Sequence, residues 1–134
     1  MTAMLKKSKS TILIVDDESM CIKFLVELLK NDYTLLVAKD AFFAIELIKK
    51  QTPDLILSDI DMPDMTGYEL LKSLKLLNLT RPIPTIFFTG RDRVTDEAEG
   101  LRLGAIDYIK KGTSADIIKY RVRNHINAIN NPPV

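Results

Sequence analysis

Short apolar segments alternate with longer amphipathic segments along most of the chain. The short segments are rich in β-branched and other apolar residues, and they are Thr11–Asp16, Thr34–Ala38, Leu55–Asp59, Ile83–Thr89 and Ile106–Ile109. Each is apolar over nearly its full length, which is typical of strands that are covered by helices on both faces. The pattern therefore predicts five buried strands.

The segments between these strands repeat their apolar residues at helical spacing. The stripes are Cys21, Ile22, Leu25, Leu28 and Leu29; Ala41, Ala44, Ile45 and Ile48; Tyr68, Leu70, Leu71, Leu74 and Leu77; and Ile117, Ile118, Val122, Ile126 and Ile129. The segment from Asp92 to Leu103 is polar and contains Gly100, so it is the weakest helix prediction. Thr113 and Asp116 suggest a capping box at the last helix. Alternating strands and helices predict a three-layer, doubly wound α/β sandwich with parallel strands and right-handed crossovers.

Composition narrows the class of protein. The 134 residues suit one domain, and 46% hydrophobic with 28% charged residues is typical of a globular protein with a core. A formal net charge of +1 gives no global field that favours nucleic acid or an anionic membrane. The single cysteine excludes an internal disulfide, and no apolar run approaches the roughly 20 residues of a membrane span. The basic segment Met1–Ser10 lacks a signal-peptide core and is interpreted as a solvated leader, so we expect a cytoplasmic protein.

Polar residues stand where the predicted strands end. Asp16 and Asp17 end the first strand, Asp59 the third and Thr89 the fourth, and Lys111 follows the fifth. In an open parallel sheet, ligands bind in the crevice beyond the carboxyl ends of the strands. We therefore expect these residues to meet in one crevice, although none of them is informative alone.

The residue types in this crevice favour phosphoryl chemistry. Three neighbouring carboxylates repel one another unless a cation neutralises them, and magnesium prefers oxygen ligands of this kind. A carboxylate can also act as a nucleophile and form an aspartyl phosphate. A magnesium ion, the Lys111 ammonium and the Thr89 hydroxyl would then serve the phosphoryl oxygens, because phosphoryl transfer depends mainly on positioning and charge neutralisation.

Four stretches in this order resemble the receiver domains of two-component response regulators. They are Ile12–Glu18 (Ile-Leu-Ile-Val-Asp-Asp-Glu), Leu55–Gly67 (Leu-Ile-Leu-Ser-Asp-Ile-Asp-Met-Pro-Asp-Met-Thr-Gly), Ile86–Gly90 (Ile-Phe-Phe-Thr-Gly) and Gly104–Lys111 (Gly-Ala-Ile-Asp-Tyr-Ile-Lys-Lys). The resemblance extends over residues 10–130, which we take as one receiver domain. It implies a flavodoxin-like fold with strand order 2-1-3-4-5.

The resemblance also implies roles for individual residues. Asp59 would be the phosphoacceptor, with Thr89 and Lys111 assisting catalysis and with Thr89 and Tyr108 forming the switch. The metal ligands would be Asp16, Asp17, Asp59 and the backbone carbonyl of Asp61, holding Mg²⁺ or, as a substitute, Mn²⁺.

In function, the chain would be a phosphorylation-dependent switch in a phosphorelay rather than a turnover enzyme for an external substrate. It would catalyse its own phosphorylation and dephosphorylation. The partners would be a sensor histidine kinase or a histidine phosphotransfer protein. The output face would be formed by the fourth helix, fifth strand and fifth helix. Charges on that face could support a weak homodimer; they are Asp96, Glu97, Glu99, Arg102, Lys119, Arg121 and Arg123.

Two positions depart from the family pattern. Gly112 follows Lys111 where the family usually has proline, and a cis bond before a non-proline residue is costly. We therefore expect a trans bond between Lys111 and Gly112, with the glycine supplying backbone freedom. Gly90 replaces the small alanine or serine that usually follows the switch threonine, which is compatible with a close approach of the phosphoryl group.

Several residues call for simpler interpretations. Cys21 lies on an apolar stripe and is expected to be a buried structural thiol. His125 lies beside the stripe of the last helix and is expected to be packed or half-exposed rather than a ligand. Asp61 and Arg91, two positions beyond Asp59 and Thr89 respectively, are expected to meet across the mouth of the crevice.

Two other functions fit parts of the pattern. Asp59-Ile-Asp61 resembles the Asp-x-Asp motif of haloacid-dehalogenase-type phosphatases, but in that family this motif comes first and the acidic pair late. A flavodoxin-like flavin-binding protein would need a phosphate-binding loop after the first strand, where Asp16, Asp17 and Glu18 would repel a phosphate. Turnover of a phosphate ester or a bound chromophore would favour these alternatives.

Overall fold

A five-stranded parallel sheet forms the centre of the structure, a computed structural model that describes residues 8–79 and 82–133. The strand order is β2-β1-β3-β4-β5, as predicted. The bounds are β1 Thr11–Val15, β2 Thr34–Ala38, β3 Leu55–Ser58, β4 Thr85–Thr89 and β5 Asp107–Lys110. Because the chain passes from β2 across β1 to β3, the strand order reverses beside β1, and the crevice at the carboxyl ends of β1 and β3 is the expected ligand site.

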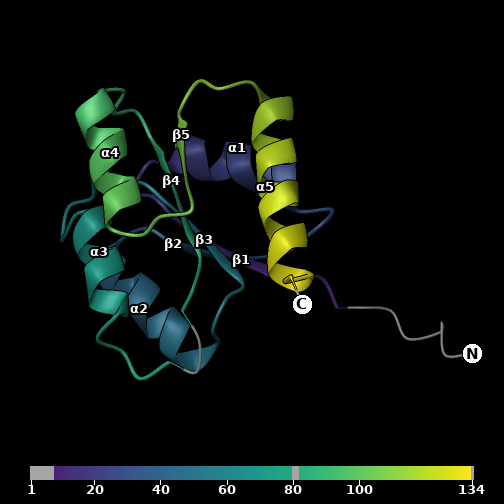
Figure 1. The fold of residues 1–134 in the computed structure, drawn as a ribbon, viewed down its shortest axis with the longest axis horizontal. Helices are drawn as coiled ribbons and strands as arrows, with labels where there is room; N and C mark the ends of the chain where they lie inside the picture. The colour runs from purple at the N-terminus through teal and green to yellow at the C-terminus, as the bar shows by residue number, and fades with distance from the viewer. Residues whose placement is uncertain (1–7, 80–81, 134) are drawn as a thin grey trace, which may run out of the picture.

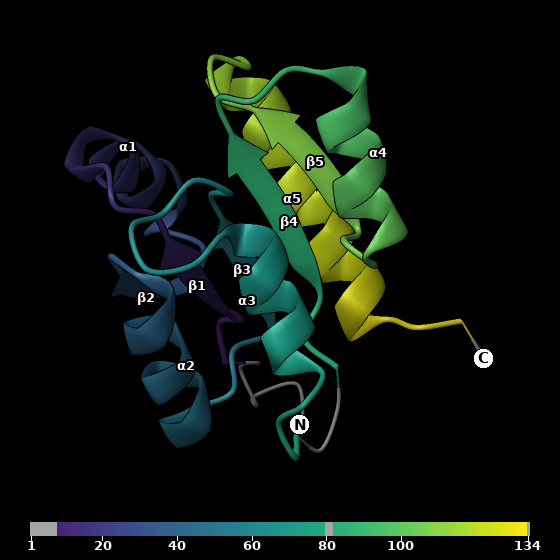
Figure 2. The same cartoon turned by 90° about the vertical axis from the view of Figure 1, so that its left-hand side faces the viewer.

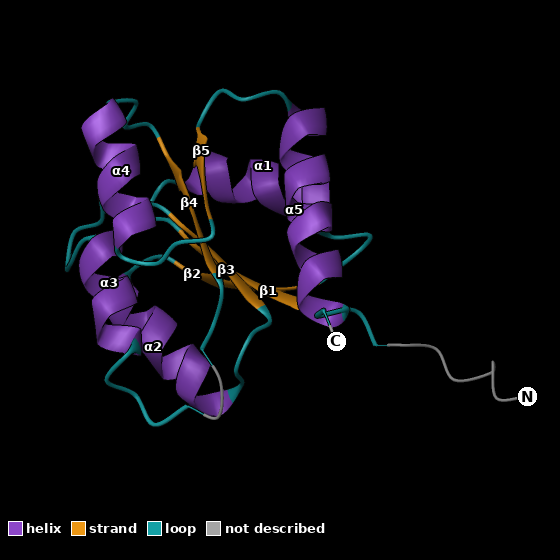
Figure 3. Ribbon diagram, viewed as in Figure 1, coloured by secondary structure: helices purple, strands orange, loops and turns teal. Residues whose placement is uncertain are grey.

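Five helices cover the two faces of this sheet. α1 and α5 lie on one face, and α2, α3 and α4 lie on the other (Figures 1 and 2). The bounds are α1 Ser19–Leu29, α2 Ala41–Lys50, α3 Gly67–Leu74, α4 Val94–Arg102 and α5 Ala115–Asn130. The alternation of strands and helices along the chain is visible in Figure 3. The predicted three-layer α/β sandwich is therefore confirmed.

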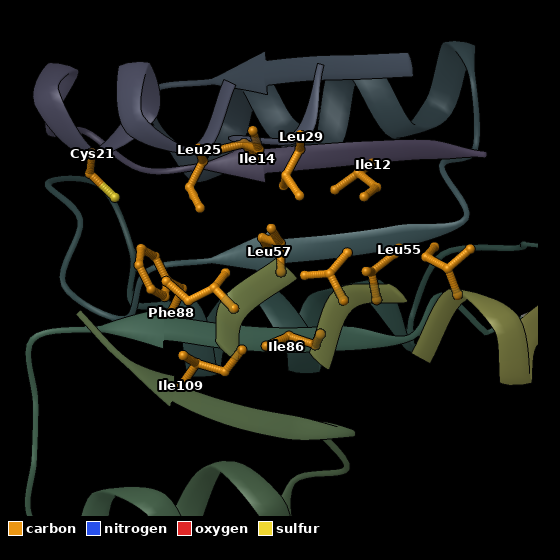
Figure 4. Close-up of a cluster of buried hydrophobic side chains, with 13 residues drawn as sticks. Ile12, Ile14, Cys21, Leu25, Leu29, Leu55, Leu57, Ile86, Phe88 and Ile109 are labelled. Atoms are coloured by element: carbon orange, nitrogen blue, oxygen red, sulfur yellow. The ribbon is translucent and has the colours of Figure 1, made fainter. Parts of the chain in front are cut away.

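The core lies on both faces of the sheet because the central strands are apolar on both sides. On one face, Ile14 and Ile86 cluster with Leu25 of α1 (Figure 4). Val122 of α5 belongs to the same cluster. On the other face, α2 and α3 pack against Leu13 and neighbouring residues of β1 and β3. Burial of each large aliphatic side chain contributes roughly 1.5–3 kcal/mol. The strand ends that carry the polar residues are thereby fixed by the core.

α4 forms despite its weak sequence pattern. Gly100 is its buried residue, and a Cβ at this position would lie 2.9 Å from the ring of Phe87. The glycine that lowers helix propensity is thus what allows α4 to approach the sheet. The remaining positions face outward more than inward, which explains why the apolar stripe is weak.

Several predicted strand bounds and one predicted helix cap are wrong. β1 ends at Val15 rather than Asp16, β3 ends at Ser58 rather than Asp59, and β5 is Asp107–Lys110 rather than Ile106–Ile109. β4 begins at Thr85 rather than Ile83, because Pro84 cannot donate a backbone hydrogen bond to a strand ladder. α5 is capped by Ser114, whose side chain accepts from Ile117 N at 3.4 Å, rather than by a Thr113–Asp116 capping box. Thr113 is instead used in a turn, where its N–H donates to the carbonyl of Lys110 at 3.1 Å.

Residues 1–7 of the predicted leader lie outside the described residues. Across the described residues, no helix combines the length and the apolar character that crossing a lipid bilayer would require.

Candidate functional site

Three carboxylates meet at the carboxyl ends of β1 and β3. Asp59 directly follows β3, and its N–H donates to the carbonyl of Val15 at 2.9 Å. Asp16 follows β1 and is held by a bond from its N–H to the carbonyl of Ala38 at 3.1 Å. One carboxylate oxygen from each of Asp16, Asp17 and Asp59 lies within 4.8 Å of the others. The sheet therefore brings together residues separated by more than forty positions, as the sequence predicted.

Lys111 completes the interior of this crevice. Its Nζ lies 3.0 Å from Asp59 Oδ2, 3.0 Å from Asp16 Oδ2 and 3.5 Å from Glu18 Oε1. Burial of the ammonium opposes its charge, but the hydrogen bonds to Asp16 and Asp59 outweigh this effect, so the pKa of Lys111 is raised above its ordinary value. Lys111 is therefore a permanent cation at neutral pH. Sequence reasoning had not paired it with Glu18.

The loop after Lys111 agrees with the expectation for Gly112. The peptide bond between the two residues is trans, since the described residues contain no cis bond. Gly112 has a φ of +97°, which L side chains rarely adopt. The Lys111 N–H donates to the carbonyl of Thr89 at 2.8 Å and so fixes the lysine to the end of β4. Gly112 thus supplies the backbone freedom that this turn requires.

Thr89 and Tyr108 are both tied to the backbone of Arg91. Thr89 is fully buried, and its Oγ1 accepts from the N–H of Arg91 at 3.3 Å. The Tyr108 hydroxyl donates to the carbonyl of Arg91 at 2.9 Å, and the residue is 5% exposed. Burial raises the pKa of Tyr108, so the hydroxyl keeps its proton. The two predicted switch residues therefore contact one shared segment, the loop between β4 and α4.

Asp61 and Arg91 form the expected pair at the mouth of the crevice. Arg91 Nε lies 3.1 Å from Asp61 Oδ2 and Arg91 Nη2 lies 2.6 Å from Asp61 Oδ1, so the pair is bidentate. The hydrogen bonds from Arg91 lower the pKa of Asp61. Arg91 also reaches Asp96 of α4, at 3.3 Å between Nη1 and Oδ1, and it stacks over Tyr68 at 5.8 Å. These last two contacts could not be predicted from the sequence, because they depend on how α3 and α4 pack beside the loop of Arg91.

The loop that carries Asp59 is anchored by residues that sequence reasoning missed. Asp64 accepts from the N–H groups of Ala41 and Phe42 at 3.2 and 2.8 Å, and thereby caps α2 from a distant loop. A Cβ on Gly67 would collide with the backbone oxygen of Asp59, so α3 can begin this close to the acceptor only with glycine. Only the Thr66–Glu69 capping box of α3 had a local signal, the Thr-x-x-Glu spacing.

The surroundings predicted for Cys21 and His125 are confirmed. Cys21 is 7% exposed, and burial raises the pKa of its thiol. His125 is half-buried, with Nε2 3.0 Å from Asp107 Oδ2, so it is a packed histidine with a carboxylate partner.

The acidic cluster has the donor set that a hard divalent cation prefers. Magnesium is held in proteins by one or two carboxylates together with waters and phosphate oxygens. Asp16, Asp17 and Asp59 offer carboxylate oxygens at a separation that one ion could bridge. The side chain of Asp61 is engaged by Arg91, and the place of its backbone carbonyl in the ligand set stays a prediction.

The fold and the acidic crevice define the class as a flavodoxin-like α/β protein with a phosphoryl-type site. Residues 12–123 match the response regulator receiver domain family, and the chain belongs to this family. It is therefore a receiver domain of two-component signalling, in which such domains take phosphoryl groups from histidine kinases. Because the chain belongs to the receiver family, the phosphatase and flavin-binding hypotheses are rejected.

Two relatives show the contexts in which similar domains occur. The chain is 40% identical over 119 residues to "Probable cyclic di-GMP phosphodiesterase" from Vibrio cholerae serotype O1, and 39% identical over 119 residues to "Histidine kinase P4" from Formosa agariphila. Each alignment covers 89% of this chain, but only 27% of the first relative and 9% of the second. The chain therefore corresponds to a small part of both proteins.

Solved structures agree with the family and the fold. A CheY-like receiver domain protein from Methanospirillum hungatei has a TM-score of 0.83 at 29% identity, covering 94% of this chain and 100% of that one. The receiver domain of a histidine kinase from Syntrophus aciditrophicus has a TM-score of 0.81 at 29% identity, covering 92% of this chain and 95% of that one. The architecture is thus shared by a CheY-like receiver domain protein and by the receiver domain of a histidine kinase.

Proposed function

We propose that this receiver accepts its phosphoryl group on Asp59 and uses Asp16, Asp17, Asp59 and the backbone carbonyl of Asp61 to hold Mg²⁺, or Mn²⁺ in its place. The observation that carries the proposal is that Lys111 Nζ bridges Asp59 and Asp16 at 3.0 Å each, inside a cluster of three carboxylates. Such a site combines a nucleophile with cations on both of its sides.

In the transfer step, a carboxylate oxygen of Asp59 attacks the phosphorus of a phosphohistidine. The P–O bond forms as the P–N bond breaks, and the imidazole nitrogen of the donor keeps the electron pair. A bound divalent cation would supply charge neutralisation for the phosphoryl oxygens. Lys111 would move from the carboxylates to a phosphoryl oxygen, and the Thr89 hydroxyl would donate to another. Water later attacks the same phosphorus; the P–O bond to Asp59 breaks, the carboxylate of Asp59 is regenerated and inorganic phosphate leaves, so the domain turns over only its own phosphoryl group.

We further propose that Thr89 and Tyr108 report the phosphoryl group to the face of α4, β5 and α5. Both residues bond to the backbone of Arg91, so a movement of Thr89 toward the phosphoryl group would break one of two bonds on this segment. Arg91 also contacts Asp96 in the first turn of α4. The change would therefore reach α4 through direct contacts.

The surface beside the crevice suits a histidine-containing partner. Met20 and Phe24, one turn apart on α1, are 82% and 41% exposed. They line an open groove of about 330 Å³ that continues to Lys111 and Gly112. An apolar patch of this kind marks an interaction surface, because it would leave water when a partner binds. A sensor histidine kinase or a histidine phosphotransfer protein docked here would bring its phosphohistidine to Asp59.

The proposal also covers the bounds of the domain and its compartment in the cell. The receiver domain would run over residues 10–130, which spans β1 to the end of α5. It would act in the cytoplasm, where the kinase domains of sensor proteins have their ATP, and without direct contact to nucleic acid or membrane.

A weak homodimer through the face of α4, β5 and α5 remains part of the proposal. Several of its charges already have partners within one chain, since Glu99 pairs with Arg102 at 2.7 Å and Arg121 with Asp107 at 3.5 Å. Exposed ion pairs contribute little individually, so the dimer should be weak and salt-sensitive. Sedimentation with beryllofluoride and magnesium should show dimers at low salt that dissociate in high salt. Monomers with and without beryllofluoride at low salt would contradict this.

Labelling with a small phosphoryl donor tests the phosphoacceptor. Incubation with acetyl phosphate and magnesium should add one base-labile phosphoryl group to the wild-type protein, measured by intact mass. Asp59→Asn should abolish the adduct, while the matched variant Asp54→Asn, at the other end of β3, should retain it. Equal labelling of wild type and Asp59→Asn would reject Asp59 as the acceptor.

A further inference from the structure

A second cleft lies near the amino-terminal ends of β1 and β2, whereas the phosphorylation crevice lies at the carboxyl ends of the strands. The second cleft has a volume of about 480 Å³ and is lined by α5, by the turn before β2 and by the segment before β1; the lining residues are Ser8, Lys9, Ser10, Asp32, Tyr33, Lys119, Arg123, Ile126, Asn127 and Asn130. Ser10 and Asn130 are joined by a hydrogen bond of 3.2 Å, so the two ends of the described chain meet here. Figure 1 shows the end of α5 beside the start of β1.

The charges in this cleft are mostly positive. Lys9, Lys119 and Arg123 face one carboxylate, that of Asp32. Lys119, Arg123 and Asn127 follow one another at intervals of four residues, so they lie on one face of α5. Like charges at this spacing repel, so Lys119 and Arg123 do not stabilise the helix α5 through their contact with each other.

Three cations of the cleft have no ion-pair partner in the described part of the chain. Within residues 8–79 and 82–133, no carboxylate lies within ion-pair distance of Lys9, Lys119 or Arg123. By contrast, Arg91 and Arg121 are both ion-paired. The cleft therefore holds positive charge that is not used within the described part of the chain.

Arg123 is a donor of the cleft whose side chain is restrained by a neighbouring ring, and it stays exposed. The Arg123 guanidinium stacks over the ring of Tyr120 at 4.9 Å, which restrains its plane and leaves its edge N–H groups for a ligand. The hydroxyl of Tyr33 and the amide of Asn127 add neutral donors. The volume lies within the range of about 300–1,000 Å³ that is usual for small-molecule sites.

We propose that this cleft binds a small phosphate-bearing anion. An arginine fork matches two phosphoryl oxygens, while the lysines act as point charges around the remaining ones. More than one phosphate is expected, because the cations come from two separate elements, α5 and the segment before β1. The ligand would be a nucleotide or an inorganic polyphosphate. It would link α5 of the output face to the segments that precede β1 and β2. This site is independent of the chemistry at Asp59.

Binding can be tested with inorganic pyrophosphate and with ADP as separate probes. The full chain is titrated at low ionic strength, without divalent metal, and amide chemical shifts are followed by NMR. Saturable shifts are expected at Tyr33, Arg123 and Asn127. The double variant Lys119→Gln/Arg123→Gln should weaken binding by roughly 2- to 25-fold, since each exposed cation contributes about 1.4- to 5-fold. Tighter binding of ADP would identify a nucleotide site, and equal or weaker binding an inorganic polyphosphate site.

Two controls make the result specific. Lys50→Gln removes an exposed cation at the end of α2 and should leave the affinity unchanged. Asp59→Asn should also leave it unchanged, so a failed phosphorylation proposal would not affect this result. The inference is overturned if neither probe gives saturable shifts up to about 10 mM, if Lys50→Gln weakens binding as much as the double variant, or if the shifts map to the crevice.

Discussion

The interior and the mouth of the crevice contain the same kinds of charge in very different surroundings. In the interior, Lys111 bonds to Asp16 and Asp59, whose side chains are 2% and 8% exposed. At the mouth, Arg91 makes a shorter, bidentate contact with Asp61, but these side chains are 33% and 63% exposed. Distance alone would rank the mouth as the stronger interaction, whereas burial ranks the interior first.

The supports of the two regions differ as well. Asp16, Asp59 and Lys111 are held at strand ends by backbone hydrogen bonds to neighbouring strands or strand ends. Asp61 and Arg91 stand on loops, and Arg91 has a second partner in Asp96. The interior should therefore determine whether phosphorylation occurs at all, while the mouth should adjust how long the phosphoryl group lasts.

The largest effect is expected from Lys111→Met. This change leaves Asp16 and Asp59 buried near each other without their cation, so we expect a loss of about 1–3 kcal/mol in the free energy of unfolding, measured by urea denaturation without magnesium. Acetyl-phosphate labelling should slow by a factor on the order of 10², since one charge that stabilises the transition state is lost.

Lys110→Met is the matched control for this change. Lys110 is the preceding residue, it is exposed, and it has no ion pair among the described residues. If both variants lose the same stability, the interior carries no special electrostatic energy and the comparison fails.

Magnesium should have the next largest effect. A ligand that binds only the folded state stabilises it, and at ten times its dissociation constant the gain is about 1.4 kcal/mol. For a domain of this size, the melting temperature should rise by roughly 3–6 °C in millimolar magnesium. Sodium chloride of equal ionic strength is the control, and an equal rise in that salt would mean that no site is formed. Asp16→Asn should reduce the rise, whereas Arg91→Ala at the mouth should not.

The residues of the interior could be predicted from the sequence because their meeting depends on topology. Once the strands are recognised, the positions of Asp16, Asp59, Thr89 and Lys111 follow from the shared carboxyl edge of a parallel sheet. The predicted start of β4 is wrong by two residues, because the strand begins after Pro84. These errors move an element end by one or two residues and leave the site unchanged.

Contacts that depend on packing between helices could not be predicted. The cap that Asp64 provides to α2, and the reach of Arg91 to Asp96, join segments whose distance is fixed only by the folded structure. The Thr113–Asp116 capping box failed for a related reason, because two capping residues stand side by side and the turn at Gly112 selects Ser114. Local sequence rules do not include the effect of that turn on which residue caps α5.

The smallest effect is expected at the mouth, where Asp61 and Arg91 can act in two opposing ways. As a lid, the pair would obstruct the water that attacks the phosphoryl group in line. Alternatively, Asp61 would orient that water as a general base and speed hydrolysis. We predict obstruction, because the hydrogen bonds from Arg91 lower the pKa of Asp61 and make it a weaker base. An exposed ion pair is worth about 0.2–1 kcal/mol, so the lid should lengthen the phosphoryl half-life by roughly 1.4- to 5-fold.

The half-lives of Asp61→Asn, Arg91→Ala and the double variant decide between the two. Obstruction predicts faster loss in both single variants and no further loss in the double variant, since both remove the same pair. Arg93→Ala, an exposed arginine at the start of α4, should not change the half-life. Because the pKa of Asp61 is lowered in the folded state, the pair forms fully above the unfolded pKa of about 3.9 and is lost only as pH falls through the folded value. The difference between wild type and Asp61→Asn should therefore stay constant from about pH 6 to 8, and slower loss in Asp61→Asn would instead make Asp61 the group that orients water.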